Sequence, residues 1–104
     1  MKLAILLHGL EKDKPILKEI MDKLQDQLNH IDSDDVETLF CIDQGESTIE
    51  EKKAWLLEQT EAKKYVFITA ETEIPDNFII LRFNATKGGK TTEQLSELGV
   101  YTKM

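Results

Sequence analysis

Apolar residues form two patterns along the first third of the chain, a continuous run and then a helical repeat. Residues 2–7 (KLAILL) form a continuous apolar run, which is typical of a strand covered on both faces. Apolar side chains then recur at steps of three and four, which predicts a helix with one wide apolar face. They are Ile16, Leu17, Ile20, Met21, Leu24, Leu28 and Ile31. Asp13 is placed to cap this helix, Pro15 falls in its first turn, and the polar residues 32–35 end it.

A second strand and a second helix follow. Residues 36–42 (VETLFCI) predict the strand, and residues 43–45 (DQG) predict a turn out of it. Thr48 and Glu51 have the spacing of a capping box, which begins a helix. The buried face of this helix is expected to include Ile49, Ala54, Leu56 or Leu57, and part of Trp55.

The last part of the chain predicts two more strands and a short helix. Residues 65–68 form the third strand, and residues 78–83 (FIILRF), after a turn at 75–77, are predicted to form the fourth. Residues 84–90 are predicted to be a loop. Thr91 and Gln94 form another capping-box pattern, and Gly99 ends the helix that it begins.

This order of elements predicts a single small α/β domain over residues 1–104. We expect a Rossmann-like sheet of about four strands with two main helices and a short C-terminal helix. Strands separated by helices form parallel pairs. The connection between the third and fourth strands is too short for a helical crossover, so the fourth strand is expected to run antiparallel or lie at an edge.

Composition narrows the classes of partner. Thirteen basic and twenty acidic residues give a net charge of −7, which disfavours nucleic acid and permits a basic protein surface. Charge on solvated helix faces explains the same composition as simple solubility. Apolar runs are too short for membrane insertion, and the start lacks a signal-peptide pattern, so a cytoplasmic setting is expected. The single cysteine, Cys41, is predicted to be a buried, inert thiol within a strand.

Polar residues follow three of the predicted strands. His8 and Gly9 follow the first, Asp43 follows the second, and Thr69 and Glu71 follow the third. Because parallel strands present their carboxyl ends at one edge of a sheet, these residues predict a ligand crevice there. Ordinary turn chemistry is the alternative explanation of residues 43–45.

The segment 48–79 (TIEEKKAWLLEQTEAKKYVFITAETEIPDNFI) reads as a capped helix, a strand and an acidic turn. Together with the first strand and Asp43, it resembles the N-terminal half of a GT-A-fold, family-2-like nucleotide-sugar glycosyltransferase over roughly the first eighty residues. The resemblance implies that Asp43 contacts the base or ribose and that basic residues early in the helix approach the nucleotide. The matching positions in that helix are Lys52 and Lys53. Together with the residues at the strand ends, the residues predicted to bind a nucleotide are His8, Gly9, Asp43, Lys52, Lys53 and Glu71. A solvated helix face is the alternative for the two lysines.

The chain departs from this family at the metal-binding motif. Where the family has an Asp-x-Asp type motif that binds Mn²⁺ or Mg²⁺, this chain has residues 69–72 (TAET). Glu71 and Glu73 are weak metal candidates, so no metal or cofactor is expected unless the glycosyltransferase activity survives. The later half of the family's domain, which supplies the acceptor-activating base, does not follow. Catalysis by this chain alone is therefore not expected.

Residues 84–91 (NATKGGKT) resemble a P-loop, G-x-x-x-x-G-K-[ST], with Asn84 in place of the first glycine. Gly89, Lys90 and Thr91 would then bind phosphate. A surface loop with a threonine helix cap is the alternative.

Three functions follow from these patterns. The first is a non-catalytic interaction or structural accessory module on a reduced glycosyltransferase-like scaffold, whose partner is another protein or a second copy of the chain. The small size and acidic character of the chain suggest a phage-encoded decoration or host-factor-blocking protein, which would place it in a virion or in the cytoplasm. The second is a nucleotide-sugar-binding glycosyltransferase fragment that acts with a partner chain. The third is a P-loop-like phosphate binder.

Overall fold

The computed structural model describes residues 3–31, 33–88 and 90–103. The main elements are β1 (Leu3–Leu10), α1 (Lys14–Leu28), β2 (Val36–Asp43), α2 (Ile49–Gln59), β3 (Lys64–Ile68), α3 (Phe78–Lys87), α4 (Thr92–Glu97) and β4 (Tyr101–Thr102). Short 3₁₀ turns, η1 (Glu11–Asp13) and η2 (Ser33–Asp35), precede α1 and β2. The predicted α/β fold is confirmed. Lys2 and Asp32, which the sequence assigns to the first strand and to the end of the first helix, lie outside the described residues.

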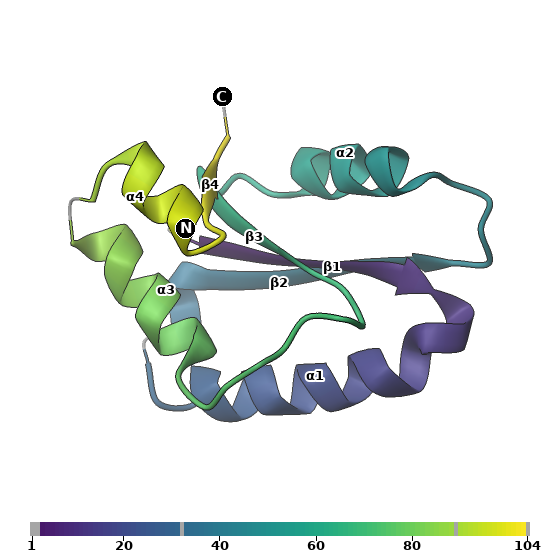
Figure 1. Ribbon diagram of the computed structural model, residues 1–104, viewed down its shortest axis with the longest axis horizontal. Helices are drawn as coiled ribbons and strands as arrows, with labels where there is room; N and C mark the ends of the chain where they lie inside the picture. The colour runs from purple at the N-terminus through teal and green to yellow at the C-terminus, as the bar shows by residue number, and fades with distance from the viewer. Residues whose placement is uncertain (1–2, 32, 89, 104) are drawn as a thin grey trace.

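The sheet has the strand order β2-β1-β3-β4. β1 pairs in parallel with β2 along its whole length and with β3 over four residues, whereas β4 runs antiparallel to β3. β1 is therefore the central strand of the parallel part (Figure 1). The side chains of residues 3–7 are at most 1% exposed. The continuous apolar run of this strand fits its place, because helices cover both of its faces.

Side chains alternate between the two faces of β1, and each face has its own core. Leu3, Ile5 and Leu7 pack in the larger core, to which α1, α3 and α4 contribute. Ala4 and Leu6 pack on the opposite face against Leu56 of α2. Figure 1 shows the resulting layers, with α2 on one side of the sheet and α1 on the other. The period of two in a strand produces this division.

The prediction of a strand over residues 78–83 is wrong, because these residues begin helix α3. Gln27 of α1 is buried, and its side-chain Oε1 accepts a hydrogen bond from the backbone N–H of Ile79 at 2.6 Å. Its Nε2 donates to the carbonyl of Pro75 at 2.7 Å. Asn77 at the N-cap position makes no side-chain capping bond. A side chain of α1 therefore accepts the hydrogen bond of a backbone N–H in the first turn of α3. The sequence around residue 78 contains no sign of this contact, because Gln27 is far away in the chain.

The predicted loop over 84–90 is also wrong in its first half, because α3 continues to Lys87. The remaining strand of the sheet is the two-residue β4 near the C-terminus. It runs antiparallel and lies at an edge of the sheet. The expected orientation of a fourth strand is thus realised by a different segment.

Both capping boxes are confirmed. The Thr48 hydroxyl accepts from the Glu51 N–H at 3.1 Å, and the Thr91 hydroxyl accepts from the Gln94 N–H at 3.2 Å. The first long helix differs at its ends from the prediction. α1 ends at Leu28, and the Asp13 carboxylate accepts from the Leu10 N–H at 3.4 Å instead of capping the helix.

The inward face of α2 includes Leu56, as predicted, but otherwise differs from the prediction. Lys52 and Leu56 are its buried residues, whereas Ile49 is 57% exposed, Trp55 is 47% exposed and Ala54 is exposed. Lys52 and Leu56 are four residues apart and so lie on one side of the helix. A lysine can occupy this buried position because its ammonium group is bound by the Asp43 carboxylate and the Gly9 carbonyl.

Cys41 is partly exposed and not fully buried as predicted, since β2 is the edge strand of the sheet. Partial burial, followed by the charge of Asp43, raises the pKa of its thiol. The thiol is therefore protonated at neutral pH. Within the described part of the chain, no helix has both the length and the apolar character needed to cross a bilayer.

Candidate functional site

A cavity of about 420 Å³ lies at the carboxyl ends of β1 and β3. Its walls are residues 8–10 of β1, Asp13, residues 47–49 and Lys52 of α2, and residues 69–71 after β3. The chain leaves β1 toward β2 on one side and then crosses to β3 on the other side. Open α/β sheets bind ligands at such a switch point. We call this cavity the switch-point crevice.

His8 forms the inner wall of the crevice. Its side chain is 4% exposed, and no described residue forms a hydrogen bond with its imidazole. Its ring packs edge-on against Phe67, with the ring centroids 6.0 Å apart. Burial lowers the pKa of His8, and the charges of Lys53 and Lys52 lower it further, against the opposite effect of Glu50. The imidazole is therefore neutral at neutral pH and offers one N–H donor and one nitrogen acceptor.

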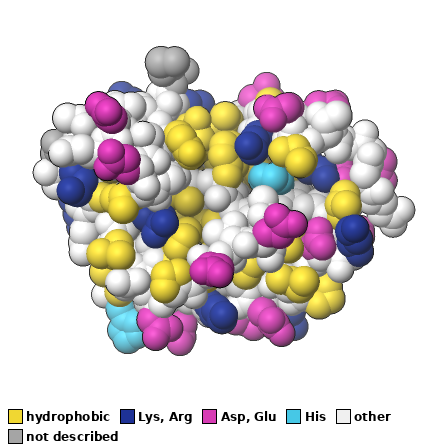
Figure 2. All heavy atoms as spheres, in the orientation of Figure 1, with side chains coloured by type: hydrophobic (Ala, Val, Ile, Leu, Met, Phe, Trp, Pro, Cys, Tyr) yellow, Lys and Arg dark blue, Asp and Glu magenta, His cyan; other side chains and the backbone are white. Residues whose placement is uncertain are grey.

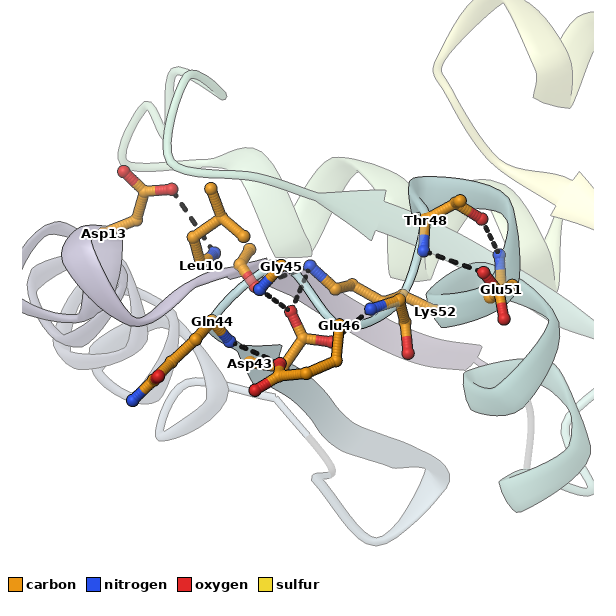
Figure 3. A network of polar contacts seen from close by, with 11 residues as sticks. Leu10, Asp13, Asp43, Gln44, Gly45, Glu46, Thr48, Glu51 and Lys52 are labelled. Carbon is orange, nitrogen blue, oxygen red and sulfur yellow. Dashed lines mark hydrogen bonds and ion pairs between the residues drawn. The ribbon is translucent and has the colours of Figure 1, made fainter.

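Lys52 closes one side of the crevice and is 3% exposed. Its Nζ lies 2.8 Å from Oδ1 of Asp43 and donates to the carbonyl of Gly9 at 3.1 Å. Figure 3 shows the lysine extending from α2 to the carboxylate at the end of β2. The pair thus joins α2 to the ends of β1 and β2.

Asp43 has a structural role in this network. Besides Lys52, its carboxylate accepts from the N–H of Gly45 at 2.9 Å and from the N–H of Ser47 at 3.2 Å. The hydrogen bond from Lys52, followed by that from Gly45, lowers the pKa of Asp43. Gly45 has a φ of +104°, which an L side chain rarely adopts. Asp43 therefore holds the turn after β2 and neutralises the buried lysine.

The turn after β3 fixes the opposite wall. The N–H of Thr69 donates to the hydroxyl of Thr72 at 3.0 Å, and the N–H of Thr72 donates back to the carbonyl of Thr69 at 3.1 Å. The N–H of Glu71 donates to the Thr69 hydroxyl at 3.3 Å. Glu71 lines the crevice, whereas Glu73 lines a separate hollow beside α1. Among the described residues, no group of three His, Cys, Asp or Glu side chains is placed to hold a metal ion.

The structure brings together most of the site residues inferred from the sequence. His8, Gly9, Lys52 and Glu71 line the crevice, and Asp43 lies behind it as the partner of Lys52. Lys53 does not line the crevice, but its Nζ lies 5.0 Å from the centroid of the Phe67 ring, against which His8 packs.

Sequence reasoning missed Asp13 and residues 47–49 as walls of the crevice. Asp13 follows the end of β1 closely, which could have indicated a place at the crevice. The sequence analysis instead explained Asp13 as the cap of the first helix. Residues 47–49 read as the start of a helix, and only the fold places that start beside the end of β1.

The P-loop-like segment lies at the other end of the molecule from the crevice (Figure 1). It follows a helix, with Asn84 inside α3, whereas a P-loop follows a strand. The Thr91 hydroxyl caps α4, and Lys90 is exposed. Gly89 lies outside the described residues.

A second hollow of about 490 Å³ lies between α1 and the edge strand β2. Its walls are apolar apart from Lys14 and Lys18, and they include Met21, Phe40 and Ile42. Phe40 is 59% exposed. This hollow lacks the fixed hydrogen-bonding groups that orient a polar ligand, which the switch-point crevice has.

Comparison with known proteins gives no relative. No family model, no curated protein and no solved structure matches this chain.

The pKa of His8 makes a prediction for stability. We expect the free energy of unfolding to fall as pH decreases below about 6.5, the ordinary pKa of histidine. The folded-state pKa is lowered, so the unfolded chain binds the proton first. This contribution is complete above the unfolded pKa and is lost as pH falls through the folded pKa.

Thermal unfolding between about pH 7.5 and pH 5.5 tests this expectation. His8→Gln should flatten the decline in melting temperature over this range. His30→Gln removes an exposed histidine and should leave the decline unchanged. Parallel curves for the wild type and His8→Gln would contradict the prediction.

Proposed function

We propose that this domain is a non-catalytic binding module whose ligand occupies the switch-point crevice. The observation that carries the proposal is the state of His8, which is 4% exposed, faces the crevice and has no hydrogen-bond partner among the described residues. The imidazole lines the crevice and makes no hydrogen bond within the described protein, so it is available to a ligand. The cavity of about 420 Å³ has the size of a small-ligand site.

The other groups of the crevice support binding and not catalysis. Lys52 and Asp43 are paired with each other, so neither is poised to exchange a proton with a substrate. The only cysteine, Cys41, lies outside the lining, and its pKa is raised. What the crevice offers is a fixed set of hydrogen-bonding groups on the ends of strands and at the start of a helix.

Nucleotide-sugar binding is the second candidate. One observation favours it: four of the six residues predicted to bind the nucleotide line the same crevice. They are His8, Gly9, Lys52 and Glu71. In this second function Asp43 would have to exchange Lys52 for the nucleotide, because its carboxylate is fully engaged in the structure.

A thermal-shift screen with a blocking variant tests the proposal. The panels are organic amines, neutral sugars, and nucleoside diphosphates and nucleotide sugars with and without Mn²⁺. A ligand at a hundred times its Kd should stabilise the wild type by ~2.7 kcal/mol, a rise of several degrees in Tm. Ser47→Trp should abolish the shift, because the larger tryptophan side chain would occupy part of the crevice. The backbone N–H of residue 47 can still donate to the Asp43 carboxylate.

Ser96→Trp is the matched control, because Ser96 is exposed on α4 and does not line the crevice. It should keep the shift. A ligand that still stabilises Ser47→Trp would bind elsewhere and overturn the proposal, as would the absence of a shift with every panel. A Mn²⁺-dependent shift with one nucleotide sugar, lost in Ser47→Trp, would favour the second candidate.

A further inference from the structure

The charges of the crevice restrict what can enter it. Two acidic residues line the crevice, Asp13 from η1 and Glu71 from the turn after β3. Lys52 is the lysine of the lining, and the carboxylate of Asp43, 2.8 Å away, neutralises it. Outside the Lys52–Asp43 pair, the charged residues of the lining are therefore acidic. Over the whole face that Figure 2 draws, by contrast, acidic and basic side chains are interspersed.

We propose that the group that enters the crevice is an organic cation, an alkylammonium or a guanidinium. It lies between the carboxylates of Asp13 and Glu71 and donates one N–H to the unprotonated nitrogen of His8. This inference rests on the proposed function and specifies its ligand. Such cations carry only donors, and these three side chains supply acceptors.

The wall of the crevice already holds one ammonium group in this way. The Nζ of Lys52 is bound by a carboxylate oxygen of Asp43 and by the carbonyl of Gly9. The cation of a ligand would find a similar environment beside it, with Glu71 and Asp13 as carboxylates and His8 as the neutral acceptor.

An anion meets the opposite conditions. A phosphate would face Asp13 and Glu71, and the lysine of the lining could bind it only by leaving Asp43. The start of α2 is also occupied, because the Thr48 hydroxyl accepts from the Glu51 N–H and the Glu51 carboxylate accepts from the Thr48 N–H. The net charge of −7 repels anions at longer range.

The cation can come from a free amine or from a lysine or arginine side chain of another protein, because both present the same chemistry. Isothermal titration with butylammonium and with methylguanidinium measures the free form. Titration with a Gly-Gly-Lys-Gly-Gly peptide, and with the same peptide carrying arginine, measures the side chain in a chain. Saturable binding of the small cations indicates a free amine, and binding of a peptide alone indicates a protein partner. Either result supports the proposal.

A charge-neutralising pair of substitutions locates the cation. Asp13→Asn with Glu71→Gln should weaken binding at least about tenfold, which corresponds to ~1.4 kcal/mol. The asparagine keeps an oxygen that can accept from the Leu10 N–H, so η1 is preserved. The control is Asp22→Asn with Glu58→Gln, which makes the same change in net charge at exposed positions outside the crevice. In the bound wild type, the ¹⁵N resonances of the His8 imidazole should shift, and those of His30 should not.

Three results would overturn the inference. Equal weakening in the two double variants would show that only the overall charge of the protein attracts the cation. A neutral sugar or nucleotide sugar that binds the wild type but not Ser47→Trp, with no cation bound, would keep the binding module and reject a cationic ligand. Failure of every panel, including the cations, would reject the binding module itself.

Discussion

Phe83→Ala should lower the free energy of unfolding by about 3–5 kcal/mol, the range for removal of a fully buried aromatic side chain. Phe83 is 2% exposed and packs in the larger core from helix α3. The loss combines the transfer of the ring to water with the cavity that it leaves. Urea denaturation followed by circular dichroism measures it.

Leu81→Ala is the matched control and should cost less than about 1 kcal/mol, because the Leu81 side chain is 50% exposed. This comparison also separates the helix from the strand that the sequence predicts. In a strand, residues 81 and 83 point to the same face, and the two substitutions would have similar costs. In helix α3 they point to different sides. Similar losses at the two positions would therefore contradict the helix.

Gln27→Leu should destabilise the protein by about 2–3 kcal/mol, because the Ile79 N–H at the start of α3 loses its hydrogen-bond partner inside the protein. The amide side chain accepts from the Ile79 N–H at 2.6 Å and donates to the Pro75 carbonyl at 2.7 Å. Ile79 is fully buried, so its N–H would have no water to replace the glutamine. For a domain of this size the loss corresponds to a fall in Tm of about 10 °C. Hydrogen exchange at the Ile79 amide should also accelerate more than in the central strand.

Gln25→Leu makes the same change on the same helix at an exposed position and should alter stability by less than about 0.5 kcal/mol. Its side chain bonds to Asn29 on the surface, where water can replace the bond. If both glutamine variants unfold at the same urea concentration, Gln27 does not hold α3 in place.

Two residues at the switch-point crevice have a different role in the structure from the one predicted from the sequence. The sequence predicts that Lys52 and Asp43 contact a nucleotide, whereas in this structure they bind each other. The buried pair joins α2 to the ends of β1 and β2, and His8, Asp13 and Glu71 line the crevice. The proposed cation follows from this division between groups that build the wall and groups that line it.

Local signals in the sequence determined much of this fold. The apolar run of β1 requires cover on both faces, and the threonine–glutamate and threonine–glutamine spacings cap α2 and α4 within their own first turns. The periodic apolar face of α1 packs on the sheet as its spacing requires. These features depend on residues a few positions apart, so the sequence alone is sufficient to predict them. The carboxyl edge as the place of the site followed from the alternation of strands and helices.

Tertiary contacts decided the rest. Residues 78–83 are apolar enough for either a strand or a helix, and Gln27, 52 residues from Ile79, supplies the missing hydrogen-bond partner that favours the helix. Lys52 is buried because the ends of two strands place a carboxylate and a carbonyl around its ammonium group. The imidazole of His8 has no hydrogen-bond partner in the described part of the chain, because the strands, the start of α2 and the turn after β3 meet around a cavity. Each outcome depends on groups far apart in the chain, whose proximity exists only once the sheet and its helices have packed.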